Sequence, residues 1–243
     1  MRLDQFLVDR GYFVTRSRAR DAILRGTVTI DGRRALKPSQ NVEGETAISV
    51  SDGAARYVSR AALKLVHALD HFGIDAAVDL ALDLGASTGG FTQVLLERGA
   101  KRVLAVDVGH GQLAPSLRTD PRVSLIERLN ARDLTWAYLP APPELITCDV
   151  SFISLTLALP PALRLAAPGA RLIALIKPQF EAGRGFLDSS GVVTDKSVHV
   201  MVCANISDWL GSQKPWRVLG VIQSPILGGD GNREFLLAAE KSR

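Results

Sequence analysis

The sequence lacks three features that would each mark a class of protein. It has only two cysteines, Cys148 and Cys203, which argues against a disulfide scaffold and fits a reducing compartment. Its longest apolar stretch, residues 155–163, contains two prolines and falls short of the roughly 20 residues that span a bilayer. The first residues carry charges throughout, unlike a secretory signal. We therefore expect a cytoplasmic protein without a membrane span.

The composition provides a core and an uneven distribution of charge. With 47% hydrophobic residues, the 243-residue chain can bury the core of one large domain and a small one. Residues 1–60 hold eleven Lys and Arg against seven Asp and Glu, whereas the rest of the chain holds eighteen of each. This local basic excess indicates either a polyanion-binding module or a solvated basic face, and charge alone leaves both open.

The first 50 residues predict a small α+β domain. Two helical segments are followed by a strand and a turn, with Gly26 placed to end the second helix. Asp31 and Gly32 form a hairpin-turn signal. The polar run at 51–59 predicts a linker, so we expect domains at 1–50 and 60–243.

A helix is expected next, from a cap at Ser59 to Phe72. Its apolar residues recur at helical spacing, and they are Ala62, Leu65, Val66, Leu69 and Phe72. Lys64 is predicted to lie off this stripe, on the side of His67 and His71. We do not expect these two histidines to bind a metal, because the neighbouring sequence offers no third ligand.

From Leu80 onward, short apolar strands alternate with helical stretches. This alternation predicts a parallel sheet with helices on both faces. The last two strands, 216–224 and 233–240, have no clear helix between them and are expected to pair antiparallel. The predicted fold class is α/β, with a Rossmann-like sheet.

A glycine-rich turn, DLGASTGGFT at 83–92, follows the first of these strands and opens a helix. Ser87 stands where a dinucleotide-binding turn needs its second glycine, which disfavours a pyrophosphate ligand. Asp107 ends the next strand, where a carboxylate can accept hydrogen bonds from ribose hydroxyls, although an isolated Asp there could also be a helix cap. The turn and Asp107 together favour a nucleoside ligand without a phosphate.

Four polar residues stand in separate, recognisable runs: Lys64 in SRAALKL, Asp149 in TCDVSFIS, Lys177 in LIKPQF and Glu234 in GNREFL. Taken singly, Lys177 is interpreted as a lysine whose aliphatic stem lies along apolar surface, and Glu234 as a surface carboxylate. Asp149 ends a strand at the sheet edge where open α/β folds bind ligands. Cys148 should point to the opposite face as an inert core thiol. Together, two cations and two carboxylates suggest one catalytic pocket.

These runs resemble the TlyA family of 2'-O-methyltransferases with an S4 RNA-binding domain, related to the FtsJ/RrmJ-type rRNA methyltransferases. The resemblance covers nearly the whole chain and implies S-adenosylmethionine as cofactor, with no metal. It also implies a catalytic tetrad of Lys64, Asp149, Lys177 and Glu234. Lys177 would orient or deprotonate the ribose hydroxyl, and a second lysine nearby would lower its pKa. Asp149 would position Lys177, and the other two would hold the ribose.

The resemblance also implies two sets of binding residues. Those for the cofactor are Asp83, Gly85, Ala86, Ser87, Thr88, Gly89, Gly90, Phe91, Asp107, Val108, Asn130 and Asp149. Those for RNA are Arg2, Arg16, Arg18, Lys37 and Arg132. Phe152 either closes the pocket near the methyl donor or packs in the core. Gln93 replaces an acidic residue common in close relatives, a minor departure.

The implied activity is 2'-O-methylation of a cytidine in ribosomal RNA. The chain is short at both ends compared with members that modify both ribosomal subunits, which favours the large subunit. A ribosome-binding or assembly factor with an inactive methyltransferase domain is the alternative from another class. A pore-forming haemolysin, a label attached to this family, is disfavoured by the lack of a signal, a span or a large amphipathic insertion.

Overall fold

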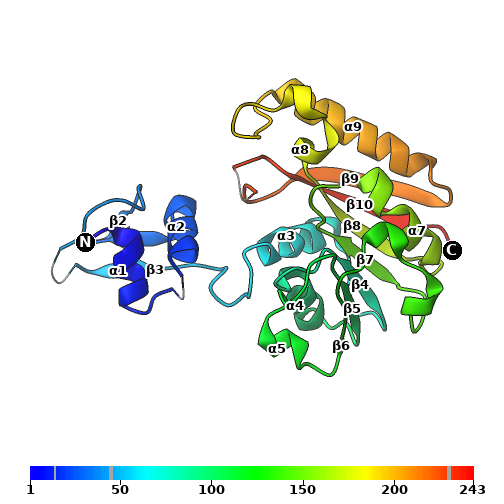
Figure 1. The fold of residues 1–243 in the computed structure, drawn as a ribbon, viewed down its shortest axis with the longest axis horizontal. Coiled ribbons are helices and arrows are strands. Elements are labelled where there is room, and N and C mark those ends of the chain that lie inside the picture. Colours follow the sequence, from blue (N-terminus) through cyan, green and yellow to red (C-terminus); the bar gives the residue numbers. More distant parts are fainter. Residues whose placement is uncertain (14, 44–45, 229–230) are drawn as a thin grey trace. The chain divides into compact units, whose positions relative to one another are not determined.

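Separate hydrophobic cores divide the chain after Arg56. The computed structural model describes residues 1–13, 15–43, 46–228 and 231–243. It forms one unit from Met1 to Arg56 and another from Tyr57 to Arg243 (Figure 1). The boundary falls inside the stretch 51–59 that the sequence predicts as a linker. No helix in these described ranges is long and apolar enough to cross a bilayer.

The first unit packs two helices against a three-stranded antiparallel sheet of order β2-β1-β3. Gly26 ends the second helix at a φ of 75°, and Asp31 and Gly32, both at positive φ, form the tight turn between the first two strands. These predicted signals are confirmed. The elements are α1 (Leu3–Asp9), α2 (Arg16–Arg25), β1 (Val28–Ile30), β2 (Arg33–Arg34) and β3 (Ile48–Val50).

The second unit alternates strands and helices along the chain, as predicted. Its strands are β4 (Ala81–Leu84), β5 (Val103–Val106), β6 (Val123–Ile126), β7 (Leu145–Cys148), β8 (Arg171–Ile176), β9 (Trp216–Gln223) and β10 (Phe235–Lys241). Its α-helices are α3 (Ala62–Phe72), α4 (Gly90–Glu97), α5 (Pro115–Arg118), α6 (Leu155–Ala158), α7 (Pro160–Leu165), α8 (Pro178–Glu181) and α9 (Lys196–Ser212). Short 3₁₀ turns, η1 (Ala131–Asp133), η2 (Trp136–Tyr138) and η3 (Arg184–Phe186), complete it.

These strands form one sheet of order β6-β5-β4-β7-β8-β10-β9. The first five are parallel, and β10 runs antiparallel between β8 and β9. This confirms the Rossmann-like prediction, including the antiparallel end. The chain builds outward from β4 through β5 and β6, then returns to place β7 on the other side of β4. Ligands of open α/β sheets bind at such a reversal, beyond the carboxyl ends of the strands.

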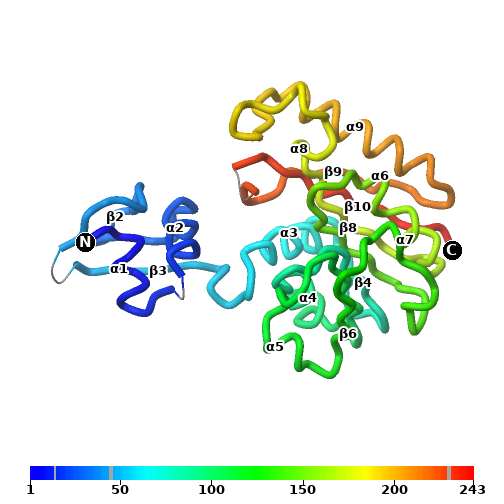
Figure 2. Tube along the Cα trace, in the orientation of Figure 1, coloured from blue at the N-terminus to red at the C-terminus, as the bar shows by residue number. Residues whose placement is uncertain are grey.

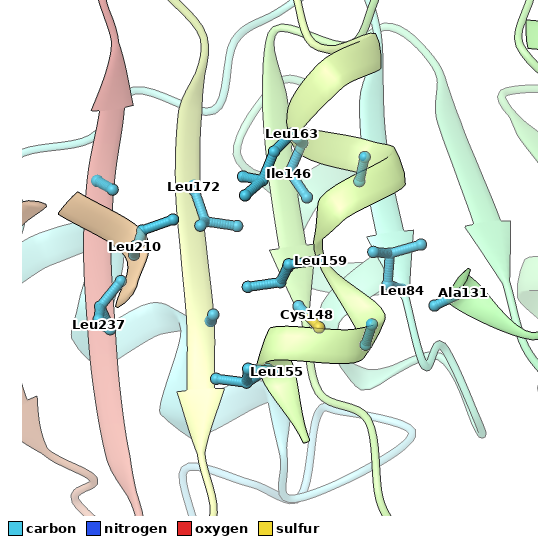
Figure 3. Packing of buried hydrophobic residues seen from close by; sticks show 14 of the residues in the cluster. Leu84, Ala131, Ile146, Cys148, Leu155, Leu159, Leu163, Leu172, Leu210 and Leu237 are labelled. Atoms are coloured by element: carbon cyan, nitrogen blue, oxygen red, sulfur yellow. The ribbon is translucent and has the colours of Figure 1, made fainter. Parts of the chain in front are cut away.

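Alternating side chains along the strands create a core on each face of the sheet. Leu145 of β7 packs in the core with α3, α4 and α5, whereas Ile146 and Cys148 pack in the core with α6, α7 and α9. Figure 3 shows Leu155, Leu159 and other leucines lying over the second face. Burial raises the pKa of the Cys148 thiol to about 12, which confirms an inert core residue. Figure 2 follows the chain into α9, which packs along β9.

Three local predictions are wrong in detail. The helix predicted from Ser59 begins at Ala62, because the Ser59 hydroxyl accepts the Ala61 N–H and stabilises a preceding turn instead. The helix predicted at 112–118 is confined to α5, with Pro115 as its first residue. Lys64, predicted to lie away from the apolar stripe, is buried on α3, since its ammonium reaches the carboxylate of Glu234 just before β10.

Adjacent leucines of the α6 segment test this packing. Leu159→Ala should lower the free energy of unfolding by about 2–5 kcal/mol, because it opens a cavity in the core where Leu159 is 1% exposed. Leu157→Ala, at a position 59% exposed, should change it by less than about 0.5 kcal/mol. All three tryptophans lie in the second unit, so their fluorescence during urea unfolding reports on this unit alone. Equal effects of the two changes would contradict the packing described.

Candidate active site and RNA-binding face

The glycine-rich turn brings the end of β4 against the end of β7. Gly85 has a φ of +81°, and a Cβ there would lie 2.6 Å from the Asp149 carbonyl oxygen. Gly89, the residue before α4, has a φ of +97°. At Gly90, a Cβ would approach the Ser59 side chain to 3.0 Å, so α4 begins in close contact with the segment before α3. The glycines therefore allow the turn to pack closely against Asp149 and the segment before α3.

Asp107 lies at the end of β5, across from this turn. Its two carboxylate oxygens accept the Ser87 N–H at 2.7 Å and the Gly109 N–H at 2.6 Å. A carboxylate has about four lone-pair sites, so two of them remain for ligand hydroxyls. The Asp107 carboxylate is thus oriented by the turn and keeps the capacity to bind a ribose.

Other predicted cofactor residues divide into those that shape this turn and those that a ligand can reach. Ala86, Gly89, Gly90 and Phe91 are buried and shape it, whereas Ser87, Thr88 and Val108 are exposed. Asn130 begins the turn η1, where its side-chain oxygen accepts the Arg132 N–H at 3.2 Å. The Leu129 N–H donates to the Asp107 carbonyl oxygen, which holds this segment beside the end of β5.

Asp83 stabilises the glycine-rich turn from the interior of the protein. Its carboxylate is fully buried and accepts hydrogen bonds from Thr92 at 2.7 Å and Thr147 at 2.9 Å. Burial raises the pKa of Asp83 to about 6, despite the two threonine hydroxyls that lower it. Asp83 therefore links β4 to α4 and β7. Because it is buried, it can affect a bound ligand only by holding the turn in its shape.

The four tetrad residues predicted from sequence form two ion pairs. Lys64 Nζ lies 2.5 Å from Glu234 Oε2, although 170 positions separate the two residues. Lys177 Nζ lies 2.6 Å from Asp149 Oδ1 and donates to the Ser151 hydroxyl at 2.9 Å. The contact with Asp149 is an ion pair whose geometry is not that of a hydrogen bond. Each lysine thus has its own carboxylate.

These ion pairs border a pocket of about 270 Å³. Its lining residues are Ser59, Arg60, Ala61, Lys64, Ser151, Phe152, Lys177, Gln179, Phe180 and Glu234. Sequence reasoning did not assign site roles to Ser151, Gln179 or Phe180. Each lies one to three positions from a tetrad residue, beyond the carboxyl end of β7 or β8, and that placement is the signal that could have found them.

Phe152 projects from the sheet edge. It is 90% exposed, which excludes core packing, and its φ of +62° is rare for a residue with a bulky side chain. Its ring centroid lies 4.9 Å from that of Phe180 on α8. Strained backbone conformations cluster at active and ligand-binding sites, so Phe152 is a candidate for contact with a ligand.

A clasp connects the segment after β7 with α8. The Glu181 carboxylate accepts the Ser154 hydroxyl at 2.6 Å and the Leu155 N–H at 2.8 Å. It thereby caps the start of α6, and burial raises the pKa of this carboxyl. Through it, the segment that carries Ser151 and Phe152 is fixed to the helix that carries Gln179 and Phe180.

The first unit presents a pair of arginines held by one buried carboxylate. Asp4 is fully buried and binds Arg2 through both of its oxygens and Arg16 through one, at 3.0–3.1 Å. The hydrogen bond from Arg2 and the charge of Arg16 lower the pKa of Asp4 to about 2. Both arginines remain about half exposed. Both arginines were predicted from the sequence as RNA contacts, whereas the aspartate that orients them was not.

Three other RNA contacts were predicted from the sequence. Lys37 is exposed in the loop between β2 and β3, and Arg18 is half-buried on α2. Arg132 belongs to the second unit, with its side chain 62% exposed and 3.8 Å from Asp133.

Asp83 gives the second unit a pH-dependent stability. Its pKa is about 6 in the folded state and has an ordinary value of 3.8, so folding favours the protonated form. This contribution is fully present below the unfolded-state pKa and is lost as the pH rises through about 6. Between about pH 4.5 and pH 7.5, the free energy of unfolding of the wild type should therefore fall by about 2 kcal/mol relative to that of Asp83→Asn.

Urea unfolding followed by tryptophan fluorescence measures this difference. Asp79→Asn is the control, because Lys101 lowers the pKa of that exposed carboxyl and its titration falls below this window. A constant difference between wild type and Asp83→Asn across the window would contradict a raised pKa of Asp83.

Comparison with known proteins agrees with this geometry. Residues 57–241 match the FtsJ-like methyltransferase family, and residues 1–48 match the S4 domain. The chain is 46% identical to the 16S/23S rRNA (cytidine-2'-O)-methyltransferase TlyA of Mycobacterium tuberculosis, over 97% of this chain and 88% of that protein.

Two further relatives are similar over nearly their whole length. Hemolysin A of Brachyspira hyodysenteriae is 39% identical, over 97% of this chain and 98% of the relative. The 23S rRNA (cytidine-2'-O)-methyltransferase TlyA of Campylobacter jejuni is 35% identical, over 97% of each chain. With its methyltransferase sheet, glycine-rich turn and S4 domain, the chain belongs to the TlyA group of the FtsJ-like methyltransferase family.

Proposed function

We propose that the protein transfers a methyl group from S-adenosylmethionine to the 2'-hydroxyl of a cytidine in ribosomal RNA. The observation that carries this proposal is the pair of lysine–carboxylate contacts at one pocket, together with the glycine-rich turn at 83–92 that is hydrogen-bonded to Asp107. The names of the two TlyA relatives supply the base, the ribose position and the class of RNA.

The turn fits S-adenosylmethionine better than a nucleotide phosphate. Residues 83–92 contain no lysine or arginine to balance a phosphate, whereas the Asp107 carboxylate suits the two hydroxyls of a ribose. The missing side chain at Gly85 lets the turn lie directly against Asp149, at the topological switch point of the sheet. Ser87, Thr88, Val108 and Asn130 would complete the nucleoside site. When bound, the cofactor supplies a methyl group already activated by a sulfonium.

Lys177 and Asp149 would handle the proton of the ribose hydroxyl. Two N–H groups of the Lys177 ammonium face Asp149 and Ser151, and the third is available to orient the hydroxyl oxygen. Transfer of the methyl group to this oxygen would leave the electron pair of the C–S bond on the cofactor's sulfur. Lys177 would give one proton to Asp149 and, as the resulting amine, accept the proton of the hydroxyl. The ammonium is thereby restored, and one carboxylate is neutralised.

From the sequence, a second lysine would favour a neutral Lys177, whereas Asp149 and Glu234 would favour a charged one. In the structure each lysine has a carboxylate within 2.6 Å, so the four charges balance in pairs. We therefore infer that Asp149, rather than a second lysine, makes proton transfer through Lys177 possible. Lys64 and Glu234 would hold the ribose on the opposite side of the pocket.

The target nucleotide must leave its RNA stack to reach this pocket. Enzymes that modify nucleotides commonly extrude them and stack the base on aromatic side chains. Phe152 is exposed next to Phe180 and lines the pocket, so it would contact the extruded base. Large-subunit RNA is the proposed substrate because the names of both TlyA relatives include 23S rRNA. The enzyme would act in the cytoplasm, where that RNA is available.

Replacement of Lys177 tests the chemistry. With methyl-labelled S-adenosylmethionine, Lys177→Ala should reduce transfer to ribosomal RNA by about 10²–10⁴-fold, the usual contribution of a general acid–base group. Cofactor affinity should stay within about threefold, since Lys177 contacts Asp149 and Ser151 rather than the glycine-rich turn. Lys196→Ala removes an exposed lysine and is the matched control.

Separate ribosomal subunits and naked rRNAs serve as substrates, and the label is mapped to base or ribose. Label on a base would overturn the proposed mechanism while leaving a methyltransferase. RNA binding without cofactor binding or label would instead support a non-catalytic assembly factor.

Removal of Arg2 tests the RNA-binding face. Arg2→Gln should weaken rRNA binding and reduce the salt dependence of the logarithm of affinity by about one unit, because about one phosphate contact is lost. Arg122→Gln is a close control, since Arg122 is equally exposed and binds Asp120 through both carboxylate oxygens, as Arg2 binds Asp4. Filter binding at several salt concentrations measures both variants. If both changes weakened RNA binding equally, the net charge of the protein, and not the position of Arg2, would account for the effect.

A further inference from the structure

The side-chain carbonyl oxygen of Gln179, a residue that lines the catalytic pocket, lacks a hydrogen-bond partner. Gln179 lies on α8, two positions after Lys177, and lines the pocket together with the tetrad lysines. Its Oε1 atom is buried and accepts no hydrogen bond from the described residues of the chain. A buried carbonyl oxygen is rarely left unpaired in a folded protein, so this one calls for an explanation.

The nearby cations are directed elsewhere. Lys177 Nζ faces Asp149 and Ser151, and Lys64 Nζ faces Glu234. The buried Gln179 oxygen is therefore an acceptor without a partner, and turning the amide toward the pocket would let a bound molecule satisfy it with an N–H or O–H donor.

The surroundings of Gln179 indicate which donor this is. Phe152 and Phe180 line the same pocket, with ring centroids 4.9 Å apart. Aromatic faces beside a polar amide are typical of sites that stack an extruded base and bind its Watson–Crick edge by hydrogen bonds. The ion pairs on the other lining elements suit the ribose. A base held by the aromatic rings would then direct its edge toward α8.

We propose that Gln179 is a specificity-determining residue, whose Oε1 accepts a hydrogen bond from the exocyclic amino group of the target cytosine. This inference rests on the proposed function and deepens it. Cytosine carries a donor at this position, whereas uracil carries a carbonyl oxygen. A site that binds a substrate N–H rejects an analogue that lacks it, because its own polar group is then left unpaired.

A double-substitution cycle tests this contact directly. The RNA or subunit methylated in the labelling experiment is rebuilt with a synthetic segment that carries either cytidine or pyrimidin-2-one ribonucleoside at the mapped nucleotide. The second nucleoside lacks only the exocyclic amino group. Wild type, Gln179→Met and Gln179→Glu are compared on both RNAs by kcat/KM. Met preserves the size of the side chain without its acceptor, and Glu preserves the acceptor.

We expect loss of the amino group to reduce wild-type kcat/KM about tenfold or more. Gln179→Met should reduce it by a similar factor on the cytidine RNA and cause no further loss on the analogue, because both changes remove one contact. Gln179→Glu should retain a preference for cytidine. Cofactor affinity and the unfolding transition should match the wild type in both variants.

Other outcomes overturn the inference. Losses that multiply would show that Gln179 and the amino group act independently, and an unchanged Gln179→Met variant would show that the oxygen binds nothing of consequence. A wild type indifferent to the amino group would exclude it as the donor. An active wild type with any of these results rejects only the role of Gln179. A wild type that methylates no ribose rejects the proposed function and this inference with it.

Discussion

The close approach of β4 and β7 is the constraint on which the site depends. At Gly85, the backbone passes so near the Asp149 carbonyl that a Cβ would lie 2.6 Å from its oxygen. This contact places the glycine-rich turn and the carboxylate Asp149 on neighbouring strands at the point where the strand order reverses. Without it, a cofactor held by the turn could not present its reactive group to the residues beyond β7. The buried Asp83 and its two threonines hold both strands in this position.

The tetrad is arranged to make four partly or fully buried charges tolerable. Taking a charge out of water is costly unless a counter-ion lies close to it, and removing one partner leaves the other uncompensated. Each pair joins two elements: α3 with the segment before β10, and the ends of β7 and β8. The Lys64–Glu234 pair therefore fixes helix α3 to the antiparallel part of the sheet.

Much of the site follows from local sequence, and the remainder from contacts that local sequence does not encode. The turn at 83–92, the strand ends at Asp107 and Asp149, and the hairpin at Asp31 were predictable because φ preferences and hydrophobic alternation act over a few residues.

The burial of Lys64 was not predictable in this way. Helical periodicity places it away from the apolar stripe, and only the position of β10 provides Glu234 as its partner, 170 positions along the chain. Similarly, the local sequence does not distinguish Asp4 from an ordinary helix residue, because only the structure shows that Arg2 and Arg16 bind it. The tetrad itself was recognised by family resemblance, since Lys177 or Glu234 alone has no distinctive signal.

The Glu181 clasp has a consequence for the entropy of substrate binding. Because Ser154 and Leu155 are bound by a carboxylate of α8, the two aromatic residues and Gln179 are not borne on independently moving loops. The loss of conformational freedom in these segments then occurs when the protein folds, rather than when RNA arrives. In the proposed reaction, more of the interaction energy with the RNA would then be left to offset the unstacking of the target nucleotide.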